Sequence, residues 1–139
     1  MIRNNGTVKQ LAWIPMAVIA IAIFSQSKPH AEFNVTNVSV SDANALVDSG
    51  AVVVDVRGKE AFDTRHIPGA LNIPVDVLRT SIPATLAASK DASVVVYCGD
   101  GSTLGPEGTS LLNKAGFSKA VNVRNGIQGW ADAGLKVAH

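Results

Sequence analysis

Two short apolar runs constrain the fold of this chain more than any other feature. Residues 51–56 and 93–97 are dominated by valine, with no helical period of polar residues inside them. Runs this short, continuous and rich in β-branched residues are typical of strands buried on both faces of a parallel sheet. Weaker strand patterns occur at 70–73 and 120–123. The sequence therefore predicts a small central sheet that is mainly parallel.

Helical patterns separate these predicted strands. We expect helices over 41–48, 59–64, 75–79, 84–88, 107–115 and 127–133. Strands that alternate with helices indicate a three-layer α/β domain with helices on both faces of the sheet. In such domains, functional residues lie where loops leave the carboxyl ends of the strands.

The start of the chain has a different character. Arg3 and Lys9 precede an apolar stretch, residues 11–24, that contains no charge. A basic flank before an apolar run is the pattern of a secretory leader, and this run is shorter than the roughly 20 residues of a spanning helix. We therefore interpret residues 1–27 as a signal peptide, and an uncleaved membrane anchor is the alternative.

The rest of the chain has room for one domain. We expect a polar linker over 28–37 and a single folded domain over 38–139. The basic residues before the apolar run should stay in the cytoplasm. The domain should then lie in the periplasm, or on the periplasmic face of the inner membrane if the leader is not cleaved. The formal net charge is only +1 and no basic run follows the leader, which argues against a nucleic-acid partner.

Cys98, the only cysteine, follows the second apolar run directly. The loop after it consists of Gly99, Asp100, Gly101, Ser102 and Thr103. Glycines let a loop curl so that its amides point inward and bind an anion, and the following helix N-terminus adds partial positive charge. Such surroundings favour the nucleophilic thiolate of Cys98. A buried structural cysteine is the alternative.

Asp100 opposes an anion site in this loop. It brings a carboxylate into the loop, which contains no Lys or Arg. Unless Asp100 points outward or pairs with a cation such as Arg124, it repels an anionic substrate.

Asp55, Arg57 and His66 are expected to support the site without touching substrate. The alternation of a strand puts Asp55 and Arg57 on the same side, where charge-assisted hydrogen bonds can tie neighbouring loops together. A solvated ion pair is the alternative. His66 stands beside a turn and is interpreted as a structural residue. The histidines show no metal-ligand spacing, so we expect neither a metal nor another cofactor.

Taken in order, these segments resemble the rhodanese-homology family. The resemblance rests on residues 54–57, 66–70, 95–98 with the glycine loop, 115–117, 121–123 and 125–130. It covers residues 38–137 and implies a single rhodanese-like domain. It also implies a thiosulfate sulfurtransferase, in which loop amides cradle a persulfide of Cys98 that passes sulfur to a thiol, a protein or cyanide. A persulfide carrier or redox partner with little turnover of its own is the alternative.

The cysteine loop departs from the family in ways that leave the donor open. Many single-domain members place an Arg late in this loop, where this chain has Thr103, Leu104 and Gly105. The loop is similar to that of mercaptopyruvate sulfurtransferases, with Asp100 where those enzymes have Ser. Dual-specificity phosphatases of the same fold need a His before the Cys and an Arg in the place of Leu104, so phosphatase activity is not expected.

The leader predicts export of the domain. A reporter that is active only in the cytoplasm should stay silent when fused after His139, and should become active when residues 1–27 are deleted. Cytoplasmic activity of the full-length fusion would contradict the prediction. A mature N-terminus near Lys28 would indicate cleavage, and an intact Met1 an anchor.

Overall fold

The computed structural model describes residues 32–139, so the expected leader, residues 1–27, lies outside the described residues. The elements are β1 (Asn37–Val38), α1 (Val40–Asp48), β2 (Val52–Asp55), α2 (Lys59–Thr64), β3 (Leu71–Asn72), α3 (Val75–Thr80), α4 (Ala84–Ala87), β4 (Val94–Tyr97), α5 (Leu104–Lys114), β5 (Ala120–Val123) and α6 (Gly126–Asp132). None of the helices in this part of the chain has the length and apolar character needed to cross a membrane.

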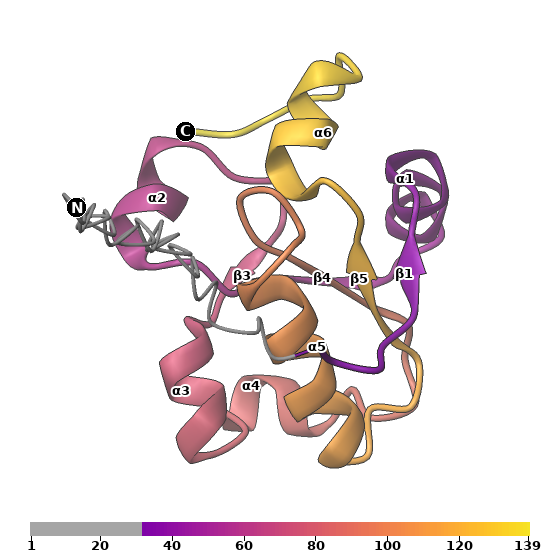
Figure 1. Cartoon of the computed structure of the whole chain (residues 1–139), viewed down its shortest axis with the longest axis vertical. Helices are drawn as coiled ribbons and strands as arrows, with labels where there is room; N and C mark the ends of the chain where they lie inside the picture. The colour runs from indigo at the N-terminus through magenta and orange to yellow at the C-terminus, as the bar shows by residue number, and fades with distance from the viewer. Residues whose placement is uncertain (1–31) are drawn as a thin grey trace, which may run out of the picture.

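The strands form one five-stranded sheet in the order β1-β5-β4-β2-β3, and each neighbouring pair is parallel. The predicted parallel α/β fold is therefore confirmed (Figure 1). The valine-rich strand β4 lies in the middle, where Val96 pairs with Val54 of β2 and with Asn122 of β5. The central position explains why β4 has no polar face.

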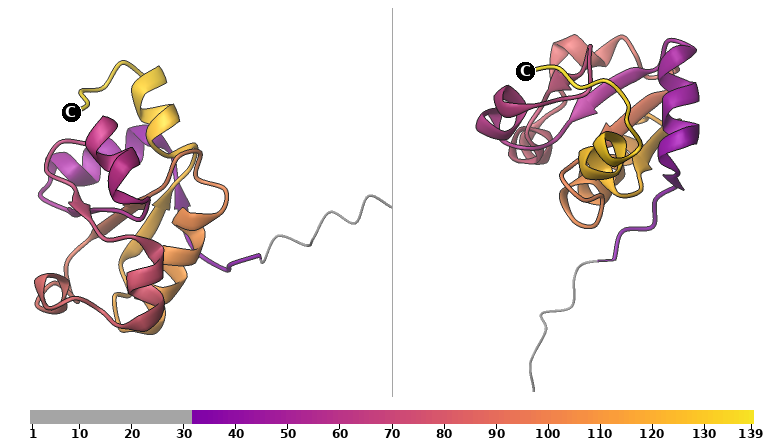
Figure 2. Two further views of the ribbon diagram at one scale, coloured as in Figure 1. Left: turned by 90° about the vertical axis from the view of Figure 1, so that its left-hand side faces the viewer. Right: turned by 90° about the horizontal axis from the view of Figure 1, so that it is seen from above.

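Helices cover both faces of the sheet (Figures 1 and 2). Side chains of α3, α4 and α5 pack with Val94 and Val96 on one face, and those of α1 and α6 pack with Val95 and Tyr97 on the other. The alternation continues past the end of β4, so that Cys98 joins the α5 side.

The helix after the cysteine loop begins earlier than the sequence predicts, at Leu104 and not at Glu107. Pro106 lies inside its first turn, where the missing N–H costs little because the first amides of a helix have no intrahelical acceptor. The early start brings the N-terminus of α5 directly after Thr103.

Strand β1 lacks a signal in the sequence because it is only two residues long. It begins at Asn37, the last residue of the expected linker, and pairs with β5. The Asn122 side chain reinforces the pairing, since its Nδ2 donates to Asn37 Oδ1 at 2.8 Å and to the carbonyl of Gly101 at 3.0 Å. Strand β5 is thereby tied to both the edge of the sheet and the cysteine loop.

Candidate active site

Cys98 lies at the carboxyl end of β4 and is 2% exposed. The backbone N–H of Gly101 donates to its Sγ over 3.2 Å. Gly101 has a φ of +79°, a left-handed conformation that favours glycine and curls the loop back over the thiol. The loop thus presents an amide to the sulfur, as the glycine pattern predicts, although one amide and not several makes this contact among the described residues.

The start of α6 holds the loop from the other side. The amides of Ile127 and Gln128 donate to the carbonyls of Cys98 and Gly99, each at 3.0 Å. First-turn amides of a helix have no acceptor within the helix, so these bonds satisfy N–H groups that would otherwise lack a hydrogen-bond partner. A Cβ at Gly126 would lie 2.3 Å from the Cys98 carbonyl oxygen, which leaves no space for any other residue.

Gly101 in the loop and Gly105 in the first turn of α5 are also tightly packed. A Cβ at Gly101 would lie 2.5 Å from the carbonyl oxygen of Val123. At Gly105 it would lie 2.2 Å from Asn122 Oδ1 and 3.2 Å from Cys98 Sγ. Asn122 Oδ1 is the one buried side-chain oxygen or nitrogen of the described residues that has no hydrogen-bond partner. Asn122 was not among the predicted site residues, although a polar residue inside a predicted strand was a usable signal.

Asp100 shapes the turn and also keeps its charge near the thiol. Its Oδ1 accepts hydrogen bonds from the amide of Ser102 at 3.0 Å and from its hydroxyl at 2.8 Å. These bonds lower the pKa of Asp100 below the ordinary carboxyl value. The same Oδ1 lies 4.0 Å from Cys98 Sγ, and no ion pair joins Asp100 to Arg124 within residues 32–139. The carboxylate therefore keeps a negative charge beside the thiol, and no ion pair within residues 32–139 neutralises it.

Asp55 and Arg57 form a buried ion pair next to the loop. Arg57 Nε and Nη2 donate to both oxygens of Asp55 at 2.8 to 3.2 Å, and Nη2 also donates to the Arg65 carbonyl at 2.7 Å. The Asp55 side chain is fully buried and that of Arg57 is 13% exposed. Burial alone lowers the pKa of Arg57, but the hydrogen bond and charge of Asp55 outweigh it and raise the pKa above the ordinary value. The pair joins the end of β2 to the segment after α2.

His66 has structural contacts and does not line the cavity at Cys98. Its Nδ1 lies 2.9 Å from the Phe62 carbonyl oxygen, its ring stacks on Phe62, and its backbone pairs with Ala138. Tyr97 supports the same turn, because its hydroxyl accepts a hydrogen bond from the Ile67 amide at 3.0 Å. Burial raises the pKa of Tyr97 well above its ordinary value, so this hydroxyl stays protonated.

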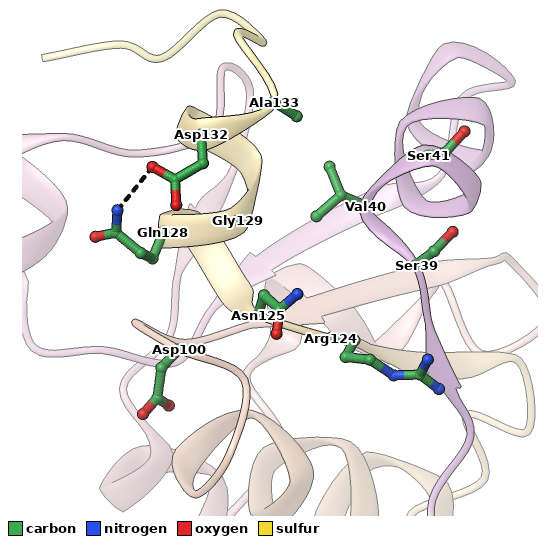
Figure 3. A pocket seen from close by; sticks show the side chains of 10 residues that line it. All are labelled: Ser39, Val40, Ser41, Asp100, Arg124, Asn125, Gln128, Gly129, Asp132 and Ala133. Atoms are coloured by element: carbon green, nitrogen blue, oxygen red, sulfur yellow. Dashed lines mark hydrogen bonds between the residues drawn. The ribbon is translucent and has the colours of Figure 1, made fainter.

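Two neighbouring cavities share Asp100 of the loop. The smaller, about 490 Å³, is lined by Arg57, Ala61, Arg65, Cys98, Gly99, Asp100, Thr103, Leu104, Ile127 and Gln128. The larger, about 780 Å³, lies between the start of α1 and α6 (Figure 3). It shares Asp100 and Gln128 with the first but does not reach Cys98. We assign the site to the smaller cavity because it holds the only cysteine.

Arg65 is a second residue of the site that was not predicted from the sequence. It follows α2 and lies in the cavity at Cys98, where its Nη2 donates to Gln128 Oε1 at 3.2 Å. No local pattern marks it, since the contact joins residues 63 positions apart. No group of three or more His, Cys, Asp or Glu side chains in the described part of the chain is placed to hold a metal ion.

Comparison with known proteins agrees with this geometry. The sequence model of the rhodanese-like domain matches residues 39–133. The chain belongs to this family. It is similar to the uncharacterized protein YibN of Escherichia coli, with 29% identity covering 92% of this chain and 87% of that protein.

Solved rhodanese-like structures resemble it as well. The human single-domain sulfurtransferase is 31% identical, with a TM-score of 0.58, covering 69% of this chain and 95% of that one. A thiosulfate sulfurtransferase from Pseudomonas aeruginosa is 32% identical, with a TM-score of 0.63, covering 76% of this chain and 20% of that one. Sulfurtransferases are thus among the structural neighbours of this rhodanese-like domain.

The contacts of Gly105 predict a large effect of a single methyl group. Gly105→Ala should lower the free energy of unfolding by about 2 kcal/mol, because the methyl group overpacks the space between Asn122 and Cys98. Urea unfolding measures the change. Gly99→Ala is the matched control, since a Cβ there meets nothing within 4 Å. Equal stability of the two variants would contradict the prediction.

Proposed function

We propose that this rhodanese-like domain is a periplasmic sulfurtransferase that carries sulfane sulfur as a persulfide on Cys98. The donor is thiosulfate or a related small anion, and the natural acceptor is a thiol or a protein. The observation that carries the proposal is the position of Cys98, which lines a cavity and whose Sγ accepts a hydrogen bond from the Gly101 amide. The similarity of the domain to two sulfurtransferases of known structure supports sulfur transfer as its chemistry.

In the first half-reaction, the Cys98 thiolate attacks the outer sulfur of thiosulfate. A bond forms between Sγ and that sulfur, the S–S bond of thiosulfate breaks, and its electron pair leaves with sulfite. The charge is conserved, since a thiolate and a dianion give a persulfide anion and sulfite. The Gly101 N–H, 3.2 Å from Sγ, stabilises negative charge on the cysteine before the attack.

In the second half-reaction, the acceptor attacks the outer persulfide sulfur. A thiolate acceptor forms a new S–S bond, the bond to Sγ breaks, and its electron pair restores the Cys98 thiolate. Cyanide gives thiocyanate by the same displacement. The cavity of about 490 Å³ has room for the outer sulfur and a small acceptor.

One observation favours the second candidate, a persulfide carrier with little turnover. The loop offers one amide to Sγ and places the Asp100 carboxylate 4.0 Å away. Loading from a small anion is then slow, whereas a protein donor brings its own contacts. Both candidates need the Cys98 persulfide, and they differ in steady-state turnover with thiosulfate.

Thiocyanate formation from thiosulfate and cyanide tests the enzyme directly. The wild-type protein should turn over and Cys98→Ser should be inactive, because the hydroxyl cannot hold sulfane sulfur. Mass spectrometry should find one added sulfur on the wild-type chain alone. Loading without turnover would favour the carrier, and no loading by any sulfane donor would exclude both.

Removing the charge of Asp100 should speed reaction with an anionic donor. Asp100→Asn keeps the oxygen that accepts from Ser102 and should raise kcat/KM for thiosulfate about 5-fold, since like charges some 4 Å apart cost about 1 kcal/mol even in water. The gain should shrink at high salt. Because the pKa of Asp100 is lowered, its charge, and so the gain, should persist wherever ordinary carboxyls are ionised.

Ser102→Ala is the matched control for the turn. It removes the hydroxyl that donates to Asp100 and leaves the charge in place. A gain in Ser102→Ala equal to that in Asp100→Asn would assign the effect to the turn and not to the charge. Unchanged or slower reaction in Asp100→Asn would show that the carboxylate does not repel the donor.

A further inference from the structure

We propose that Arg65 recognises the anionic group of the sulfur donor, a role that the cysteine loop cannot fill because it contains no cation. The inference rests on the sulfur-transfer function proposed above. Arg65, at the C-terminal end of α2, lines the same cavity as Cys98. Arg57 is the other guanidinium group of this cavity, and the two have different surroundings.

The charge of Arg57 is already compensated. Its guanidinium holds both oxygens of Asp55 and a backbone carbonyl, and Asp55 is fully buried. If a donor took Arg57 from this pair, a buried carboxylate would lose its cation, which is strongly unfavourable. The positive charge of Arg57 is thus already neutralised by Asp55, and we assign to Arg57 the positioning of the cavity wall.

The guanidinium of Arg65 has a neutral partner instead. Its Nη2 donates to Gln128 Oε1 at 3.2 Å, and no carboxylate of residues 32–139 forms an ion pair with it. Its backbone is fixed, because the amide donates to the Ala61 carbonyl and the carbonyl accepts from Arg57 Nη2. Arg65 thus brings an uncompensated positive charge to the cavity from an anchored backbone.

The charges around the cavity orient a dianionic donor. Asp100 places a negative charge 4.0 Å from Sγ, so the donor is repelled from the loop and drawn to the side of Arg65 and Gln128. Thiosulfate then binds with its sulfonate group on Arg65 and its outer sulfur toward Cys98. When Sγ attacks that sulfur, the S–S bond breaks and the electron pair leaves with sulfite, whose charge Arg65 continues to neutralise.

Alkylation of Cys98 tests the role of Arg65 without sulfur transfer. Iodoacetate is an anion and iodoacetamide is a neutral molecule of similar size, and both react with the only cysteine. The ratio of their rates reports how strongly the cavity attracts an anion, because the reactivity of the thiol cancels. In Arg65→Gln the ratio should fall about 10-fold, the low end of what a hydrogen bond to a charged group contributes. Arg65→Lys should keep most of the ratio.

Arg124→Gln is the matched control, because Arg124 lines the larger cavity and not that of Cys98 (Figure 3). It removes the same net charge and should leave the ratio unchanged. A ratio unchanged in Arg65→Gln, or lowered equally in Arg124→Gln, would overturn the proposal.

Thiosulfate kinetics separate this inference from the proposed function. Arg65→Gln should lower kcat/KM for thiosulfate about 10-fold, mainly through KM, because the lost contact holds the donor before and during the reaction. If the wild-type protein forms no thiocyanate, the proposed function fails. The alkylation ratio then still decides whether Arg65 draws anions to Cys98.

Discussion

Backbone contact between the cysteine loop and the start of α6 is the constraint on which the site depends. The carbonyls of Cys98 and Gly99 accept from the first-turn amides of α6, so the loop completes the hydrogen bonding of that helix. Gly101 and Gly126 make the contact possible, because a Cβ at either position would lie within 2.5 Å of a backbone oxygen. The loop that carries the thiol is thus held by backbone atoms, whereas the charges around it come from side chains.

Charge is divided between the two sides of the Cys98 cavity. On one side, the buried pair of Asp55 and Arg57 ties β2 to the segment after α2 and brings Arg65 to the cavity. On the other, Asp100 uses its carboxylate to form the turn with Ser102 and keeps a negative charge near Sγ. The residue that forms the turn therefore places a negative charge near the thiol, and a positive charge comes to the same cavity from a different segment.

Asn122 connects the site to the edge of the sheet. Its amide nitrogen donates to Asn37 of β1 and to Gly101 of the loop, while its oxygen packs against Gly105 at the start of α5. One buried side chain therefore contacts an edge strand, the loop and the helix behind the thiol. Any displacement of β5 along the sheet would move all of these elements together.

The sequence by itself determined the parallel sheet, most of its helices and the place of Cys98 at the end of a central strand. These features follow from local patterns: continuous valine runs, helical periodicity and glycines after the strand. Only the tertiary structure decided that β1 exists, that α5 begins at Leu104, and that Asp100 bonds to Ser102 and not to Arg124. Two-residue strands and helix ends leave weak local signals in the sequence. The hydrogen-bond partner of a side chain depends on groups that come close only in the folded chain.

The residues around Cys98 also separate into those that the sequence predicted and those that only the structure shows. Its glycine loop is contiguous in sequence and was predicted, whereas Arg65 and Asn122 reach the site from segments more than twenty positions away. Their contacts depend on the order of the strands and on how the helices cross the sheet. A short window of sequence carries no information about either. The sequence therefore determined the position of Cys98, and the tertiary structure decided which charges surround it, because electrostatic interaction depends on distance in space and not along the chain.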